Sequence, residues 1–193
     1  MTQRVSLLAD AADFTVRAFD GVIRKGSGAP YVTHLFAVSA FVGEFGGDEE
    51  QMAAALLHDY LEDIEGSSVE ELTRRFGQRV ARIVLACSDT TVRPKPPWQE
   101  RKDAHLAHLR EQPAEVRLVA ACDKLHNATC LLLDTTRDGD AAFDCFNADK
   151  KRVLWYYRAA VTALGEGWEH PVLERLSAVV GELEAVAAKS GCG

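Results

Sequence analysis

The sequence predicts an all-α fold. Apolar residues recur at helical spacing along most of the 193 residues, no segment shows the period-two alternation of a strand, and glycine, proline and capping residues separate the helical segments. A content of 47% hydrophobic and 26% charged residues is typical of a soluble globular protein. We therefore expect one compact helical domain over residues 1–193.

The first two predicted helices flank a glycine-rich loop. The first helix runs from about Gln3 to Phe19, and the loop GVIRKGSGAP follows. The second helix lies in YVTHLFAVSAFVGEFGG, where the double glycine is a natural C-terminal stop. The basic residues Arg24 and Lys25 therefore lie in a loop that precedes His34.

Capping signals mark the next two helices. Asp48 and Gln51 form a variant capping box for the helix that carries ALLHDYLEDIEG. Ser68 and Glu71 make the same signal for SVEELTRRFG. The apolar residues of ALLHDYLEDIEG gather on one side of a helix, and four polar ones gather on the other: His58, Asp59, Glu62 and Asp63. Alone, this pattern is equally typical of an ordinary surface helix.

The second half of the chain continues the helical pattern. Three prolines in VRPKPPW force an irregular connection, after which helices resume at QERKDAHLAHLRE and AEVRLVAACDKLHNATCLLLD. The segment TTRDGDAAFD is interpreted as a loop. A helix near ADKKRVLWYYRAAVTAL and a last helix over residues 171–189 complete the predicted fold.

One predicted helix is apolar on nearly every face and still carries charge. Four polar residues interrupt VRLVAACDKLHNATCLLL: Asp123, Lys124, His126 and Asn127. Burying an aspartate without a partner is costly, so this charge needs a metal, another cation or a network of donors. A purely structural ion pair with Lys124 or another base is the alternative.

Histidines and carboxylates on separate predicted helices form a set of the metal-ligand type. His34 stands in an otherwise apolar helix start, where a lone histidine is usually a hydrogen-bonded core residue. Together with His58, Asp59 and Asp123 it offers two imidazoles and two carboxylates without a thiolate, a mixture suited to Mn²⁺, Fe²⁺ or Zn²⁺. Neighbouring positions on a helix diverge by about 100°, so His58 and Asp59 would straddle a metal between helices.

The ordered pattern H…HD…D resembles the signature of the HD-domain metal-dependent phosphohydrolases. More narrowly, RKGSGAPYVTH, ALLHDYLED and DKLHN resemble the alarmone-hydrolase domain of the RelA/SpoT family and its stand-alone small alarmone hydrolases. The resemblance is collinear and spans about residues 14–160. It implies a single helical HD-domain bundle with the metal site between the central helices.

The resemblance also implies roles for individual residues. One Mn²⁺ per chain, with Fe²⁺ or Zn²⁺ as the less common ions, would be held by His34, His58, Asp59 and Asp123. The catalytic acidic pair would be Glu62 and Asp63. The substrate would contact Arg24, Lys25, Asn127 and Tyr156.

Elementary chemistry is consistent with these roles. A bound divalent ion lowers the pKa of its water and polarises a phosphoryl oxygen. On a continuous helix Glu62 lies on the metal-facing side, where it would hold the attacking water, with Asp63 as the second acid or base. Arg24 and Lys25 would neutralise a diphosphate, although a solvated loop pair is the alternative for these two residues.

Two features depart from the family pattern. After Asn127 the family often has an arginine within three residues, whereas this chain has Ala128, Thr129 and Cys130. The segments TTVRPKPPWQERK and DTTRDGDAAFDCF also differ from those of the long bifunctional enzymes. A guanosine alarmone is therefore the first expectation, with an adenosine analogue or another nucleotide 3′-diphosphate as the alternatives.

The remaining candidates are given structural interpretations. His105 and His108 have the spacing of a ligand pair, but their helix has the composition of an exposed one, so we expect both at the surface. The others are interpreted as supporting, anchoring or packing residues: His126, Trp98, Trp155 and Tyr157.

Charge and composition exclude several kinds of partner. A formal charge of −7, from 22 Lys and Arg against 29 Asp and Glu, argues against non-specific binding to nucleic acid or anionic membranes. We see neither a secretory signal nor a window of about 20 apolar residues. The five cysteines form no CxxC pair, which fits a reducing cytoplasm. Whether the chain forms homo-oligomers is left open.

The resulting hypothesis is a cytoplasmic, Mn²⁺-dependent hydrolase that acts on a small-molecule nucleotide. It would remove the 3′-diphosphate of (p)ppGpp or a (p)ppApp-like nucleotide as pyrophosphate. The alternatives are an HD phosphohydrolase for another nucleotide and a non-catalytic HD module that binds a nucleotide or a partner protein. A purely structural domain would leave Asp123 and the basic loop unexplained.

Overall fold

The computed structural model describes residues 6–90 and 94–190, and these residues form ten α-helices and one short 3₁₀ helix. The described residues contain no strand, only an isolated bridge between Ile23 and Pro30 that closes the loop after the first helix. The all-α prediction is therefore confirmed. The start expected for the first helix, residues 3–5, lies outside the described residues. None of the helices described is long and apolar enough to cross a lipid bilayer.

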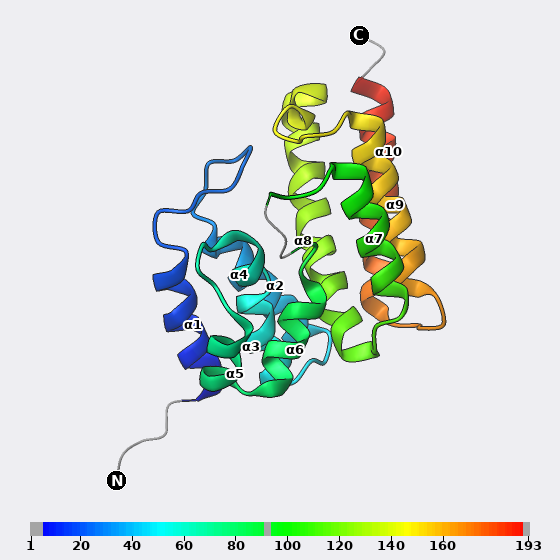
Figure 1. Cartoon of the computed structure of the whole chain (residues 1–193). Helices are drawn as coiled ribbons and strands as arrows, with labels where there is room; N and C mark the ends of the chain where they lie inside the picture. Colours follow the sequence, from blue (N-terminus) through cyan, green and yellow to red (C-terminus); the bar gives the residue numbers. More distant parts are fainter. Residues whose placement is uncertain (1–5, 91–93, 191–193) are drawn as a thin grey trace.

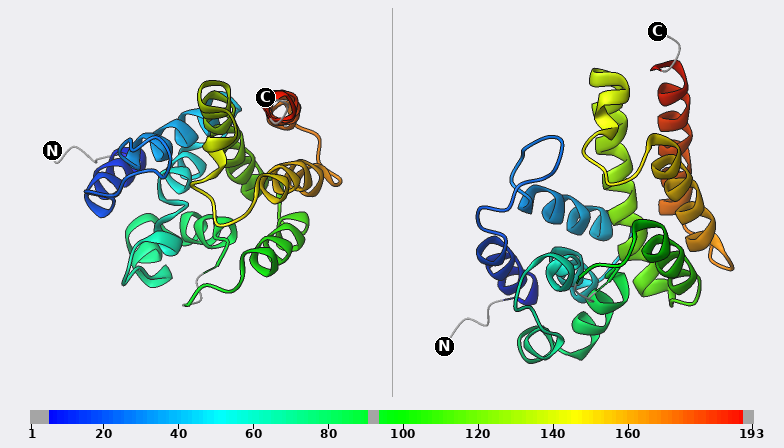
Figure 2. Two further views of the ribbon diagram at one scale, coloured as in Figure 1. Left: turned by 90° about the horizontal axis from the view of Figure 1, so that it is seen from above. Right: turned by 45° about the horizontal axis from the view of Figure 1, so that its top comes forward.

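The long helix α8 (Ala114–Asp138) separates two groups of helices (Figures 1 and 2). One group comprises α1 (Leu7–Ala18), α2 (Val32–Glu44), α3 (Glu49–Leu57), α4 (Tyr60–Asp63), α5 (Val69–Phe76) and α6 (Gln78–Cys87). The other comprises α7 (Trp98–Arg110), α9 (Lys150–Gly165) and α10 (Pro171–Ser190). The 3₁₀ helix η1 (Gly139–Phe143) follows α8 directly.

Because α8 is covered on both sides, nearly every face of it is buried. Helices α2, α3 and α6 pack against it from one group, and α9 and α10 pack against it from the other. Most buried apolar side chains form one contiguous core from Ala11 on α1 to Ala187 on α10, and a second, smaller cluster lies between α7 and α9. The apolar composition of α8 therefore follows from its central position.

The capping residues behave as their chemistry requires. The Asp48 side chain accepts from the Gln51 backbone, and the Gln51 side chain accepts from the Asp48 backbone, which completes the predicted box. Ser68 caps α5 through the Glu71 backbone N–H, but the Glu71 carboxylate accepts a hydrogen bond from the Tyr60 hydroxyl at 2.7 Å. The second box is therefore only half formed, because the buried phenol needs an acceptor.

The helix expected to run through ALLHDYLEDIEG breaks in the middle. Helix α3 ends at Leu57 and α4 begins at Tyr60, so His58 and Asp59 lie between them. Nδ1 of His58 lies 2.7 Å from the Ala55 carbonyl oxygen, which is the acceptor that the Asp59 N–H would use in a continuous helix. The expectation of one continuous helix was wrong because a ligand-type side chain competes for a backbone acceptor.

Helix α8 is longer than expected, since part of the segment interpreted as a loop is helical up to Asp138. The Thr135 and Thr136 hydroxyls each donate to the carbonyl four residues earlier, and Arg137 pairs with Asp134 at 3.1 Å. Such pairs at helical spacing stabilise an exposed helix end. The helix stops at Gly139, whose φ of +62° favours glycine.

Arg117 connects the ends of three helical segments. We therefore expect its replacement to lower the stability of the fold. Its buried guanidinium donates to four carbonyl oxygens, those of Arg110, Gln112, Leu164 and Glu166. We expect Arg117→Met to cost about 3 kcal/mol of unfolding free energy, because these acceptors lose their donor in a buried place. Urea denaturation would measure this loss. The control Arg110→Met removes an exposed cation, and a similar loss in both variants would contradict the prediction.

His105 is buried, contrary to the expected surface position, whereas His108 is exposed as expected. The imidazole of His105 is only 3% exposed, since α7 packs against α9 and buries His105, Leu106 and Leu109. Neither ring nitrogen has a hydrogen-bond partner in the part of the chain that the structure describes. Burial, reinforced by the positive charge of Lys124, lowers the pKa of His105 to about 3.

This lowered pKa makes stability depend on pH. The unfolded chain binds a proton on His105 below a pKa of about 6.5, whereas the folded chain does so only near pH 3, so stability falls as the pH drops between these values. At pH 5 we expect this effect to lower the free energy of unfolding by about 2 kcal/mol. Urea denaturation at pH 7 and pH 5 should therefore show a smaller acid loss in His105→Gln than in the wild type. His108→Gln is the matched control, and equal losses in all three proteins would contradict the prediction.

Candidate metal centre and adjoining pocket

The four residues expected to bind a metal lie together between α2, the α3–α4 break and α8. His34 Nε2 lies 3.2 Å from Asp123 Oδ1 and 3.6 Å from Asp59 Oδ2. His58 Nε2 lies 3.1 Å from Asp59 Oδ2 and 3.5 Å from Asp123 Oδ1. His58 and Asp59, at the α3–α4 break, thus both direct a donor atom to this centre.

The donor atoms suit a divalent cation. Since a carbonyl can only accept, Nδ1 of His58 donates to Ala55, and the lone pair of Nε2 faces the centre. This Nε2 is buried and has no hydrogen-bond partner in residues 6–90 and 94–190, although two carboxylate oxygens are close. Ligand atoms of His34, His58 and Asp59 lie within 4.8 Å of one another. Mixed imidazole and carboxylate donors bind first-row divalent ions.

Neighbouring side chains orient the two carboxylates. The Tyr31 hydroxyl donates to Asp59 Oδ2 at 2.7 Å. Lys124 donates to Asp123 Oδ2 at 2.6 Å, and Asn127 donates to Asp123 Oδ1 at 2.5 Å. His126, which we interpreted as a support, lies with its Nδ1 2.8 Å from His34 Nδ1. Such outer contacts fix the orientation of metal-binding side chains.

The charges at the centre favour a cation. Burial by itself lowers the pKa of His58, but the carboxylates of Asp59 and Asp123 outweigh it and raise that pKa well above its usual value. Burial by itself raises the pKa of Asp123, but Lys124 and the two imidazoles lower it well below its usual value. The carboxylates therefore stay ionised, and the field that attracts a proton to His58 also attracts a metal ion.

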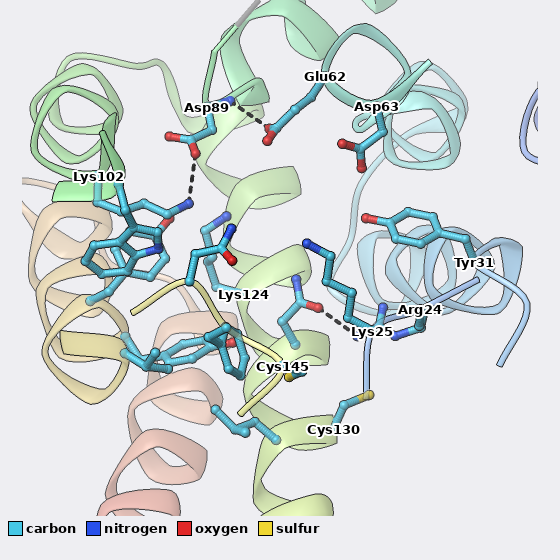
Figure 3. A pocket seen from close by; sticks show the side chains of 18 of the residues that line it. Arg24, Lys25, Tyr31, Glu62, Asp63, Asp89, Lys102, Lys124, Cys130 and Cys145 are labelled. Atoms are coloured by element: carbon cyan, nitrogen blue, oxygen red, sulfur yellow. Dashed lines mark hydrogen bonds and ion pairs between the residues drawn. The ribbon is translucent and has the colours of Figure 1, made fainter. Parts of the chain in front are cut away.

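A pocket of about 620 Å³ adjoins this centre (Figure 3), within the usual size range of small-molecule sites. Tyr31, Lys124 and Asn127, which bond the ligand carboxylates, all line it. The residues expected to act on or bind the substrate also line it: Arg24, Lys25, Glu62, Asp63, Asn127 and Tyr156. The structure thus brings every predicted site residue to one place.

The acidic pair on α4 is held by the connection between α6 and α7. Lys95 Nζ lies 2.9 Å from Glu62 Oε1 and 3.5 Å from Asp63 Oδ1, and the backbone N–H of Asp89 donates to Glu62 Oε2. Partial burial, reinforced by the charges of Asp59 and Glu62, raises the pKa of Asp63. A carboxyl group with a raised pKa is suited to donating a proton near neutral pH.

Six basic side chains line the pocket of a chain whose net charge is −7: Arg24, Lys25, Lys95, Arg101, Lys102 and Lys124. Sequence reasoning missed the roles of Lys95, Arg101 and Lys102. The available signal was the set of basic residues around the prolines in KPPWQERK. In Figure 3, Lys102 lies across the pocket from Arg24 and Lys25.

The basic loop is tied to the metal centre. Arg24 donates to Asn127 Oδ1 at 2.9 Å, and Asn127 in turn donates to Asp123, so a chain of hydrogen bonds joins the loop to α8. The alternative of a solvated pair therefore does not describe Arg24, whereas Lys25 is exposed. An ordered loop cation beside a metal centre is suited to binding an anionic group.

The aromatic residues form one wall. Tyr156 is buried, its hydroxyl has no hydrogen-bond partner among the described residues, and Lys102 Nζ lies 4.6 Å from its ring centroid. Trp98 packs against the rings of Trp155 and Tyr156, in agreement with an anchoring position. Tyr157 is buried, as expected of a packing residue, whereas Trp155, expected to pack as well, is exposed. The wall therefore combines an apolar surface with a cation.

This helical bundle, with histidine and aspartate ligands meeting between its central helices, has the features of an HD domain. Residues 11–146 match the family model described as HD domain, and the chain belongs to that family. The fold is also similar to a solved structure of a metazoan ortholog of SpoT that hydrolyses ppGpp. The TM-score is 0.75 with 21% identity, and 99% of each chain is covered.

Part of the sequence is similar to two named proteins. The guanosine-3′,5′-bis(diphosphate) 3′-pyrophosphohydrolase MESH1 of Danio rerio is 37% identical over 102 residues, which cover 52% of this chain and 54% of that protein. The bifunctional (p)ppGpp synthase/hydrolase SpoT of Escherichia coli K12 is 32% identical over 113 residues, which cover 55% of this chain and 16% of SpoT. The matched region thus spans about half the length of the first relative and about a sixth of the second.

Proposed function

We propose that this protein hydrolyses the 3′-diphosphate of an alarmone nucleotide of the (p)ppGpp type and releases pyrophosphate, with Mn²⁺ as the metal. The observation that carries the proposal is the pocket, which adjoins the metal-ligand centre and is lined by an acidic pair and six basic side chains. The names of the MESH1 and SpoT relatives, which refer to (p)ppGpp hydrolysis, support it.

The metal would be held by His34, His58, Asp59 and Asp123. When bound, it would supply a hydroxide near neutral pH and polarise a phosphoryl oxygen. Glu62 would orient the attacking water and take its proton, and Asp63, with its raised pKa, would deliver a proton to the leaving group. Lys95 would hold the acidic pair in place through its contacts with both carboxylates.

The arrangement of cations fits a substrate with two separate phosphate groups. Arg24 and Lys25 lie on one side of the pocket, and Lys102 lies on the other (Figure 3). Lys124 lies on α8 between them and already pairs with Asp123. A nucleotide with phosphates on both its 3′ and 5′ positions would place negative charge on both sides at once. Asn127 and Tyr156 would contact the nucleoside between the two groups.

The organisation of the chain belongs to the same proposal. The contiguous core from Ala11 to Ala187 supports one domain over residues 1–193. Four cysteines are free in the described part of the chain, which supports a reducing compartment such as the cytoplasm.

The test is pyrophosphate release from ppGpp, ppApp and a panel of ordinary nucleotides, with metal-stripped protein and Mn²⁺, Fe²⁺ or Zn²⁺ added back. We expect release only from 3′-diphosphates and only with metal present, with Mn²⁺ the most effective. Turnover of ordinary nucleotides instead would replace the alarmone by another substrate. Metal binding without any turnover would favour a binding module.

A further inference from the structure

The pocket has a second end, remote from the acidic pair, where two cysteines lie. The lining of the pocket as a whole includes six apolar or thiol side chains: Cys130, Leu131, Ala142, Cys145, Phe146 and Val153. In Figure 3, Cys130 and Cys145 lie on the opposite side of the pocket from Glu62 and Asp63. Apolar and thiol side chains of this kind suit a nucleobase better than a phosphate.

One carboxylate in the lining, that of Asp134, belongs to this second end. A Cβ added to Gly26 would lie 3.7 Å from the Cys145 sulfur and 3.8 Å from Asp134 Oδ2, so both atoms lie beside the loop at Gly26. Asp134 follows Asp123 by eleven residues, which is about three helical turns and about 16 Å along α8. Both residues therefore lie on one face of α8, with Asn127 between them. A single nucleotide has comparable length.

The Asp134 carboxylate has an oxygen available to a ligand. Oδ1 accepts a hydrogen bond from the exposed Arg137 at 3.1 Å. Oδ2 accepts none from residues 6–90 or 94–190, and the side chain is only 24% exposed. A partly buried carboxylate oxygen beside apolar walls gains most from a donor that the ligand brings.

From this geometry, and building on the proposed alarmone hydrolysis, we propose that Asp134 selects guanine. Guanine presents an N1–H and a 2-amino group side by side, and both are donors to a carboxylate. Adenine presents the lone pair of its N1 at the same edge, and that acceptor would face the negative charge of Asp134. Asp134 therefore favours guanine by attraction and disfavours adenine by repulsion.

The test compares kcat/KM for pyrophosphate release from ppGpp, ppIpp and ppApp. Hypoxanthine, the base of ppIpp, keeps the N1–H and lacks the 2-amino group, so the wild type should prefer ppGpp, then ppIpp, then ppApp. Asp134→Asn should lower kcat/KM for ppGpp by about tenfold to a hundredfold and should not lower it for ppApp. Asp138→Asn is the matched control, because its carboxylate pairs with the same Arg137 and does not line the pocket.

An unchanged ratio of ppGpp to ppApp turnover in Asp134→Asn would overturn the inference and leave the proposed function intact. If the wild type cleaves none of the three nucleotides, the proposed function fails. Calorimetric titration of the Mn²⁺-loaded proteins with GDP, IDP and ADP then decides the inference separately. A guanine preference that Asp134→Asn loses would support it, whereas no preference, or no binding, would overturn it.

Discussion

Replacing Asp59 by alanine is expected to abolish metal binding and to lower kcat/KM for pyrophosphate release by at least about a thousandfold. Asp59 Oδ2 lies close to both imidazoles, at 3.1 Å from His58 Nε2 and 3.6 Å from His34 Nε2. Without it the centre loses one of two negative charges, and the remaining ligands no longer surround the ion.

Metal content after dialysis against Mn²⁺ measures the first effect, and pyrophosphate release measures the second. Mn²⁺ should also raise the melting temperature of the wild type and not that of Asp59→Ala, because only the wild type gains stability from binding. Full metal content and turnover in Asp59→Ala would show that the ion is held elsewhere.

Two further variants test whether the effect of Asp59→Ala is specific to the metal ligand. Tyr31→Phe removes only the hydroxyl that orients Asp59, so we expect a smaller loss of about tenfold to a hundredfold in metal affinity or activity. Asp103→Ala removes an exposed carboxylate from α7 and should change neither property. A graded series of this kind separates the loss of a ligand from a general loss of negative charge.

Glu62→Gln is expected to lower kcat by about a hundredfold to ten-thousandfold while the protein still binds Mn²⁺. Glutamine has nearly the same shape and can still accept the Asp89 N–H, but it cannot take a proton from water. It also loses the ion pair with Lys95, which lies 2.9 Å from Glu62 Oε1. We therefore expect the chemical step to fail and the fold to persist.

Pre-steady-state and steady-state pyrophosphate release, together with metal content, measure this effect. Glu65→Gln provides the matched control, since Glu65 is exposed and lies only three residues further along the same segment. Unimpaired release in Glu62→Gln would remove Glu62 from the mechanism. A parallel loss of bound metal would instead make it a ligand.

Much of the fold could be predicted because helix signals are local. Apolar spacing, the Asp48–Gln51 box and the proline run before α7 each depend on residues within a few positions of one another. The metal-ligand candidates could also be identified from the sequence, because the order His34, His58–Asp59 and Asp123 is visible in the chain itself. The structure brings these four side chains together.

The predictions were wrong in two situations. In one, distant segments pack against each other; in the other, a side chain and the backbone compete for the same hydrogen-bond acceptor. The polar sequence of α7 favoured a surface helix, yet packing against α9 buries His105. The helix through ALLHDYLEDIEG breaks because the His58 ring takes the Ala55 carbonyl. Neither outcome follows from periodicity, since each depends on what a side chain meets after the chain folds.

The sequence by itself determined the helical class, most helix boundaries and the set of polar residues available for chemistry, because these depend on local spacing and side-chain type. Only the tertiary structure decided how the pocket is built. It brings Lys95 to Glu62 across 33 positions of the chain and places Asp134 and Cys145 beside Gly26. The physical reason is that charge and burial act through space, so contacts between distant segments decide which ionisable groups share a site.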